Sequence, residues 1–413
     1  MKFNKSRLLL VCAVSLLAAG VLTACGTATT DFVYVASSKA AGPYSYGEID
    51  VFEINAISGA MRQIPTSPFP SGGRNPVAEA VSSDYSNLYV VNHDDNSIVQ
   101  FGIGSDGKLY PLSTVNTPGT YPMAVAVNGS NLFIVDTYEP LPSCSTAQPC
   151  AGSVAVFPIA GAKSATPGEP GPTPVTNPAN GANYWPLSVP GKAGDVIAPT
   201  AINVLHSGSN VYVTAYDSSV TPTVGYVFEF SVGTGGALTL LGIEAAGIYP
   251  SAIASYTDST SATYLYVTDF TNGNVIGYLV LGSGALNPLP HSPYLAGNQP
   301  SAIVADPSYP FAYVANAQDG NVEAYSISMS GDLSFLGGSP TPVTYDAGLQ
   351  PVAMGIDPST SHFLFTVNFL GNDVSDFELS PTAGTLINTQ HSPYGASAQP
   401  VAVAAIPHGS TAK

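Results

Sequence analysis

The sequence predicts an all-β fold: a seven-bladed β-propeller of four-stranded antiparallel blades. Two observations lead to this prediction. First, a phrase in which Pro opens a run and Ala follows two residues later occurs seven times, and the last four intervals between these prolines are about fifty residues each. Second, every copy lies among short runs of strand-forming residues bounded by turn residues. Repeats of this length, each holding four short strands, are typical of propeller blades. The seven copies of this marker phrase begin at Asn75, Tyr121, Ala198, Tyr249, Gln299, Gln350 and Gln399.

Each unit can be read in order. The marker phrase is the inner strand, where the small Ala suits the crowded axis. The second strand is rich in aromatic and β-branched residues, as in NLYVVN from Asn87 or FAYVAN from Phe311. A turn with Asn, Asp or Gly leads to the third strand, because these residues tolerate the positive φ of tight hairpins. A Gly-containing turn, such as SGDL, then leads to the fourth strand.

The order of the strands also predicts how the ring closes. The first strand, 32–37, is of the second-strand type and has no marker phrase before it, whereas the chain ends on an inner strand at 400–406. The C-terminal strand should therefore complete the first blade and remove an open sheet edge. We expect the propeller over residues 32–407, an insertion at 137–197 in the third repeat, and a tail at 408–413.

The first residues predict export and a lipid anchor. Lys2, Lys5 and Arg7 form a basic segment, and residues 8–22 are apolar. The following Leu22-Thr23-Ala24-Cys25-Gly26 resembles the lipobox of bacterial lipoproteins, whose Cys becomes the lipid-modified N-terminus. An ordinary cleaved signal is the alternative. We expect a signal peptide at 1–24, a short tether at 25–31, and membrane attachment through Cys25 in the cell envelope, on the periplasmic or outer-membrane side of a Gram-negative cell.

Composition restricts the partners. The net charge is −17 and only 9% of the residues are charged, so no basic patch can form and nucleic acid is excluded. A phosphorylated substrate is disfavoured for the same reason. In an oxidising compartment Cys144 and Cys150 should form a local disulfide. The alternative, a two-cysteine metal site, lacks further ligands nearby. We expect no cofactor and a monomer.

The second-strand phrases LYVVN, LYVTD and AYVAN are close to the YVTN phrase. On these repeats the chain resembles the bacterial lactonase-like propeller family, which includes 6-phosphogluconolactonase-type enzymes and YVTN-repeat proteins. The resemblance covers residues 32–407 and implies a propeller and, as one reading, hydrolysis of a lactone. Enzymes of this family often show Pro-Arg-His at the start of inner strands, whereas the matching positions here read Pro-Val-Ala or Pro-Ser-Ala.

Two kinds of loop share one face of a propeller: those leading into each inner strand and those between the second and third strands. We call this the top face. The residue before each marker Pro should ring the channel mouth there. Six of these seven residues are polar, which is the default pattern of a binding site for a small molecule, glycan or protein. These predicted ligand-binding residues are Asn75, Tyr121, Tyr249, Gln299, Gln350 and Gln399, with Ala198 as the apolar seventh.

The phrase His-Ser-Pro-Tyr occurs twice, from His291 and from His391, and we expect both copies in top-face loops. TSPF from Thr66 and GSPT from Gly338 occupy the same place in other units, so Ser-Pro is interpreted as a turn device. The histidines are then exposed or structurally satisfied. The alternative is that one contacts a ligand, where its near-neutral pKa would suit general-base work on an ester or lactone.

Glu79 is the one charged residue at the third position after a marker Pro; the other six units have Val, Ile or Met there. A buried carboxylate needs a partner or water. Glu79 therefore either pairs with Arg74 or is solvated in the channel, or it acts as acid or base while Arg74 stabilises an oxyanion.

Aspartates in the top-face loops offer oxygens for a Ca²⁺ ion, but they belong to different blades and Asp is common in turns, so we predict no metal site. These aspartates are Asp94, Asp95, Asp136, Asp217, Asp269, Asp319 and Asp373.

Two functions remain open. The first is a lipid-anchored propeller that binds its ligand at the channel mouth. The second is a lactone hydrolase that uses Glu79, Arg74 and one of His291 and His391. No Gly-x-Ser-x-Gly elbow or His-Glu-x-x-His motif decides between them.

Overall fold

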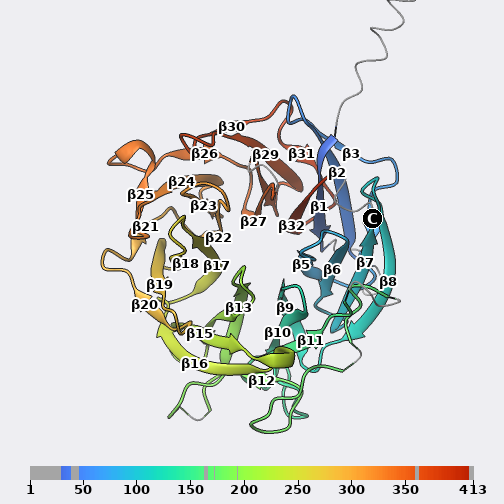
Figure 1. Ribbon diagram of the computed structural model, residues 1–413, viewed down its shortest axis with the longest axis vertical. Coiled ribbons are helices and arrows are strands. Elements are labelled where there is room, and N and C mark those ends of the chain that lie inside the picture. Colours follow the sequence, from blue (N-terminus) through green and yellow to red (C-terminus); the bar gives the residue numbers. More distant parts are fainter. Residues whose placement is uncertain are drawn as a thin grey trace, which may run out of the picture.

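Seven antiparallel sheets stand around a central axis in the computed structural model; three have four strands, and four have a short fifth strand that pairs with the third (Figure 1). The structure describes residues 29–38, 46–161, 166–171, 173–192, 194–358 and 362–408. Each blade runs outward from an inner strand, and the seven inner strands contact one another in a closed circle. The predicted seven-bladed propeller is therefore confirmed.

Blades 1 to 4 have the following strands, from the axis outward. Blade 1 has β32 (Pro400–Pro407), β1 (Thr29–Ser37), β2 (Glu48–Asn55) and β3 (Met61–Gln63), with β4 (Phe69–Pro70). Blade 2 has β5 (Pro76–Val81), β6 (Asn87–Asn92), β7 (Ser97–Ile103) and β8 (Leu109–Asn116). Blade 3 has β9 (Thr120–Val127), β10 (Asn131–Tyr138), β11 (Ser153–Pro158) and β12 (Trp185–Pro186). Blade 4 has β13 (Ile197–Val204), β14 (Asn210–Asp217), β15 (Val224–Val232) and β16 (Leu238–Ala245).

In blades 5 to 7, as with β3 and β4 in blade 1, the outer strand is in two pieces that both pair with the third strand. Blade 5 has β17 (Pro250–Thr257), β18 (Thr263–Asp269), β19 (Asn274–Val280) and the pieces β20 (Leu286–Pro288) and β21 (Tyr294–Leu295). Blade 6 has β22 (Pro300–Ala305), β23 (Phe311–Asn316), β24 (Asn321–Ile327), β25 (Leu333–Phe335) and β26 (Thr344–Asp346). Blade 7 has β27 (Pro351–Ile356), β28 (Phe363–Asn368), β29 (Asp373–Leu379), β30 (Leu386–Asn388) and β31 (Tyr394–Gly395).

The C-terminal strand closes the ring as predicted. β1 lies between β2 and β32, and its register with β32 runs from Asp31 opposite Pro407 to Ser37 opposite Pro400. β32 in turn contacts the inner strands β27 and β5. The first and last strands of the chain therefore share one blade, which leaves no inner edge unpaired. β1 begins at Thr29, three residues before the predicted start.

The Ser-Pro phrase is a turn device in three blades. The Ser67, Ser292 and Ser392 hydroxyls each accept a hydrogen bond from a third-strand amide, at 2.8, 2.9 and 2.9 Å. Each Ser-Pro bond is cis. These turns lie where the outer strand breaks, so the hydroxyl satisfies an amide that the interrupted ladder leaves open. In the GSPT copy the Val343 carbonyl accepts the equivalent amide at 3.1 Å.

The third blade carries its additional residues in two loops. The segment 137–197, predicted as one insertion, contains β11 and β12. The extra residues therefore lie between β10 and β11 and between β11 and β12. The first loop holds the predicted disulfide, which is confirmed between Cys144 and Cys150 with a Cα–Cα distance of 5.4 Å. Trp185, in β12, is buried and donates from Nε1 to the Leu238 carbonyl at 2.9 Å.

The predicted signal peptide and Cys25 lie outside the described residues, so the lipid anchor stays a prediction. Within the described ranges no helix is long and apolar enough to cross a membrane.

Gly297 belongs to a loop that packs tightly against the second strand of blade 6. A Cβ added there would lie 2.6 Å from Asp319 Oδ2 and 2.7 Å from Asn316 Cγ. We expect Gly297→Ala to lower the free energy of unfolding by about 1–3 kcal/mol, as overpacking does, measured by urea denaturation. Gly395→Ala is the control, because its Cβ meets nothing within 4 Å. Equal stability of the two variants would show that this loop can yield.

Candidate functional site

The residue before each marker Pro has a backbone role that the sequence did not reveal. Five of the seven adopt a left-handed conformation that side chains rarely favour: Asn75, Tyr121, Gln299, Gln350 and Gln399. Their carbonyls accept hydrogen bonds from the residue after the second strand, as in Ala317 N to Gln299 O at 2.8 Å and Phe369 N to Gln350 O at 2.9 Å. A ring of strained residues at one end of the inner strands is typical of functional sites.

A pocket of about 540 Å³ occupies the channel mouth on this top face. Its volume lies within the range of small-molecule sites. Six of the seven blades contribute to its wall. The lining residues are His93, Met123, Thr137, Ala198, Pro199, Thr200, Tyr216, Tyr249, Ser251, Phe270, Ser301 and Val352. Tyr249 and Ala198 are thus the members of the predicted ring that line it.

Aromatic rings dominate one side of the pocket. Tyr249 lies between Tyr216, at a centroid distance of 4.6 Å, and Phe270, at 5.7 Å, with tilted planes. On the side of blades 2 and 3, the His93 ring stacks on Tyr121 at 4.8 Å. These rings offer apolar faces that would pack against a ligand.

Hydroxyl groups occupy the deeper wall, directly after the marker prolines. The Ser251 and Ser301 hydroxyls each donate to the marker Pro carbonyl of the next blade, Pro300 and Pro351, both at 2.6 Å. These hydrogen bonds tie neighbouring blades together. They also use the hydroxyl protons, so Ser301 Oγ is left as an acceptor, whereas Ser251 Oγ also lies 2.8 Å from Thr268 Oγ1.

Arg74 lies at the top face and is held by Asp95. Its Nε and Nη2 both lie 2.6 Å from Asp95 Oδ1, and its backbone amide donates to Asp95 Oδ2 at 2.7 Å. The predicted pair between Arg74 and Glu79 is therefore not formed.

Beside Arg74, His93 Nδ1 lies 2.7 Å from Asp94 Oδ1. The same oxygen also accepts a hydrogen bond from the side-chain nitrogen Nδ2 of Asn75 at 3.2 Å. Partial burial opposes ionisation of Asp94, but these hydrogen bonds outweigh it and lower its pKa. His93 is thus the histidine at the mouth, and it is paired with a carboxylate.

Glu79 lies between blades 1 and 2 instead of at the mouth. Neither of its carboxylate oxygens has a hydrogen-bond partner, and both are shielded from solvent. Burial raises the pKa of Glu79 well above its ordinary value, and the nearby Ala404 backbone of β32, which does not reach hydrogen-bond geometry, only partly offsets this. The equivalent residues Ile253 and Ile303 are buried in apolar clusters between neighbouring blades. The position therefore faces the preceding blade, so Glu79 takes the place of a core residue.

The two HSPY histidines were expected in top-face loops, and this placement was wrong. They lie in the turn between the two pieces of the outer strand, β20 and β21 in blade 5 and β30 and β31 in blade 7. The side chain of His291 is 76% exposed, and its Nδ1 lies 3.2 Å from Asp332 Oδ2. His391 adopts a positive φ of 72°. Neither lines the mouth pocket, so the structure does not bring Glu79, Arg74, His291 and His391 together.

Several top-face aspartates hold backbone amides. Asp269 accepts from the amides of Ile248 and Tyr249 at 2.9 and 3.1 Å, and Asp319 accepts from Asn298 at 2.7 Å. Burial raises the pKa of Asp136 to about 7, although Thr117 and the Gly119 amide oppose this. Within the described part of the chain no three His, Cys, Asp or Glu residues are grouped to hold a metal ion. These hydrogen bonds favour the interpretation that the aspartates stabilise turns.

Sequence reasoning missed most of the pocket wall. His93 and Phe270 directly follow second strands, and their amides bond to the carbonyls of Asn75 and Tyr249. Their positions would follow from pairing each second strand in register with its marker phrase. Ser251 and Ser301 belong to the marker phrases themselves, directly after Pro250 and Pro300.

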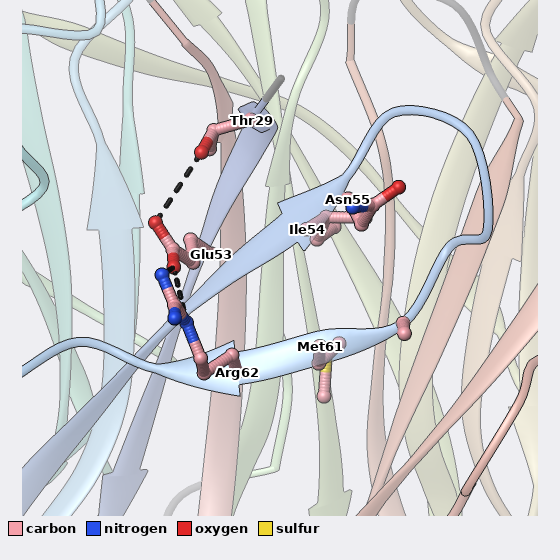
Figure 2. A pocket seen from close by; sticks show the side chains of 7 residues that line it. Thr29, Glu53, Ile54, Asn55, Met61 and Arg62 are labelled. Atoms are coloured by element: carbon pink, nitrogen blue, oxygen red, sulfur yellow. Dashed lines mark hydrogen bonds and ion pairs between the residues drawn. The ribbon is translucent and has the colours of Figure 1, made fainter. Parts of the chain in front are cut away.

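A second pocket, of about 200 Å³, lies at the opposite face in blade 1 (Figure 2). Its polar groups satisfy one another: Glu53 accepts from Thr29 Oγ1 at 3.3 Å and from Arg62 Nε at 2.6 Å (Figure 2). Its charged pair is thus satisfied internally and its volume is less than half that of the mouth pocket, so the mouth pocket is the stronger candidate.

Comparisons with known proteins agree with the propeller fold. The family model described as "Lactonase, 7-bladed beta-propeller" matches residues 43–139. Among solved structures, a candidate 6-phosphogluconolactonase from Bacteroides fragilis is 18% identical, with a TM-score of 0.68 over 92% of this chain and 99% of that chain. The periplasmic gluconolactonase PpgL of Pseudomonas aeruginosa is 17% identical, with a TM-score of 0.67 over 91% and 99%. No curated protein matches the sequence. The solved structures confirm the seven-bladed fold, and the chain is similar to lactonase-type propellers over residues 43–139, in agreement with the resemblance that its repeats predicted.

Proposed function

We propose that this protein is a lipid-anchored, extracytoplasmic propeller that binds a small molecule at the channel mouth. The supporting observation is the pocket of about 540 Å³ to which six blades contribute side chains, among them aromatic rings and hydroxyl groups. Apolar walls with a few placed polar groups are the pattern of a ligand site.

The strand directions agree with such an anchor. Ser37 pairs with Pro400 at the end of the inner strands that forms the mouth, whereas Thr29 pairs with Asn55 at the other end of β1. A lipid on Cys25 would therefore hold the propeller by the face opposite the mouth. The pocket would then open away from the membrane and remain accessible to ligands.

Filling the pocket tests the proposal. We expect Ser301→Trp to abolish the thermal shift that a bound small molecule produces in the form comprising residues 26–413. Ser301→Ala is the matched control, because it also loses the bond to the Pro351 carbonyl but leaves the pocket open. A ligand that shifts the melting temperature of wild type and Ser301→Trp equally would bind elsewhere and contradict the proposal.

Lactone hydrolysis is the second candidate, and one geometric observation favours it. His93 lines the pocket, and its Nδ1 lies 2.7 Å from Asp94 Oδ1. This pairing orients the imidazole, which would act as the general base on a water molecule that attacks a bound lactone. Solved structures with this fold include a protein named as a gluconolactonase, whose name describes that protein alone.

Turnover of a panel of sugar and acyl-homoserine lactones tests this candidate. If the protein hydrolyses one of them, His93→Gln should lower kcat/KM by about 10²–10⁴-fold, the usual contribution of a general base. His391→Gln, on the outer edge of blade 7, is the control and should keep full activity. Undiminished turnover in His93→Gln would exclude this mechanism, and absence of turnover on every lactone would leave a binding propeller.

A further inference from the structure

The mouth pocket has a charge preference that follows from its wall. Among the described residues that line it there is neither Lys nor Arg. The described basic side chains nearest in the chain to mouth residues, Arg74 and Lys192, are each engaged: Arg74 with Asp95, and Lys192 with Asp195 at 3.7 Å and with the Tyr226 hydroxyl at 3.0 Å. A phosphate or carboxylate placed in this pocket would find neither Lys nor Arg available to pair with it, so an anionic ligand is disfavoured.

The aromatic side of the pocket is suited to the opposite charge. Tyr216, Tyr249 and Phe270 form a continuous series of rings whose neighbouring planes are inclined by 39° and 58°. All three side chains line the pocket, and the face of an aromatic ring carries partial negative charge. Such faces attract cations, and quaternary ammonium groups are bound in this way.

The remaining polar groups and the overall charge act in the same direction. The Ser301 hydroxyl donates its proton to the Pro351 carbonyl, so its oxygen keeps lone pairs that favour a nearby positive charge. The chain carries a net charge of −17, and a concave mouth focuses the resulting negative potential on an approaching cation.

We propose that the channel mouth binds an organic cation with a substituted ammonium group, whose apolar surface packs against Tyr216, Tyr249 and Phe270. This inference rests on the proposed function, because it names the ligand class of the same pocket. It differs from that proposal in requiring the positive charge.

The test compares two probes of nearly equal shape by isothermal titration calorimetry at low ionic strength. Choline carries the charge, and 3,3-dimethylbutan-1-ol is its neutral isostere. Choline should bind at least about tenfold more tightly, as expected for a desolvated cation–π contact. Tyr249→Leu should weaken choline binding by about tenfold, whereas Tyr249→Phe keeps the π-face and should stay within about twofold. Tyr110→Leu, at an exposed position of β8, is the control.

The outcomes separate the two proposals. Equal binding of both probes, lost in Ser301→Trp, would overturn the charge preference and leave the small-molecule pocket standing. Binding of choline that Tyr249→Leu does not weaken would also overturn it, because the rings would then not be the binding surface. If neither probe binds but an anionic lactone does, the inference fails, because the pocket then prefers an anionic ligand.

Discussion

Glu79→Met should make the protein more stable, by about 1–3 kcal/mol at pH 8, the typical cost of a buried polar group without a partner. The carboxylate oxygens of Glu79 are shielded and have no hydrogen-bond partner in the structure. Blade 7 shows that the substitute fits, since Met354 occupies the equivalent position and packs against the apolar cluster there. Removing an uncompensated carboxyl from a contact between blades should therefore raise the free energy of unfolding.

The stabilisation should depend on pH with a defined sign. Burial raises the pKa of Glu79 well above its ordinary value of 4.5, so the folded protein retains a proton that the unfolded chain releases. Stability due to this proton is complete below about pH 4.5 and falls as pH rises toward the folded-state pKa, by up to about 1.4 kcal/mol per pH unit. The difference between Glu79→Met and wild type should consequently be smallest near pH 4.5 and grow with pH.

Urea denaturation at several pH values between 4.5 and 8.5 measures this difference. Glu79→Gln is the matched control for shape, since it removes the titration but keeps a polar group in the apolar contact. The stability of Glu79→Gln should depend less on pH than that of wild type, but it should gain less stability than Glu79→Met. Burial also raises the pKa of Asp136 and Glu229 to about 7, so a residual decline with pH should persist in both variants. A constant difference between Glu79→Met and wild type across this range would contradict a protonated Glu79.

The repeats contained enough information for the fold, because the constraints on a blade are local. A marker Pro with a small Ala opens every inner strand, and three of the seven marker alanines, Ala124, Ala302 and Ala402, are buried while the other four are partly buried. The missing marker before the first strand likewise indicated that β32 closes the ring. Strand type and order are visible in single units, so seven copies made the prediction strong.

The site was less accessible to sequence reasoning, since side-chain direction depends on register. Glu79 was interpreted as facing the channel, but a register shift between Pro76 and Ala78 changes the alternation, and the side chain lies between two blades. The HSPY turns were misplaced for a related reason: nothing in the sequence shows that the outer strand resumes after the turn at Tyr294, where β21 pairs with β19. His93 was missed because its role arises from pairing across strands.

Truncation after Gln399 should prevent the chain from reaching its closed fold, the largest effect that we expect. The deletion removes β32, whose ladder with β1 extends from Asp31 to Ser37 and whose surface contacts β27 and β5. Blade 1 would lose its inner strand, exposing an unpaired edge and opening the ring of inner strands. The contacts around this gap should cost more than the roughly 5–15 kcal/mol by which a domain is usually stable.

Circular dichroism and size-exclusion chromatography of the two truncated forms test this expectation. Truncation after His408 is the control, because it keeps every described contact of β32 and should retain a cooperative melting transition. The form ending at Gln399 should lack this transition and aggregate, since an open edge pairs readily with other chains. Adding a synthetic peptide of residues 400–408 should restore soluble protein in proportion to the peptide bound, because the vacant inner position fits that strand alone. A cooperative transition without the peptide would show that six complete blades and an incomplete seventh are sufficient, and that closure by β32 adds little to stability.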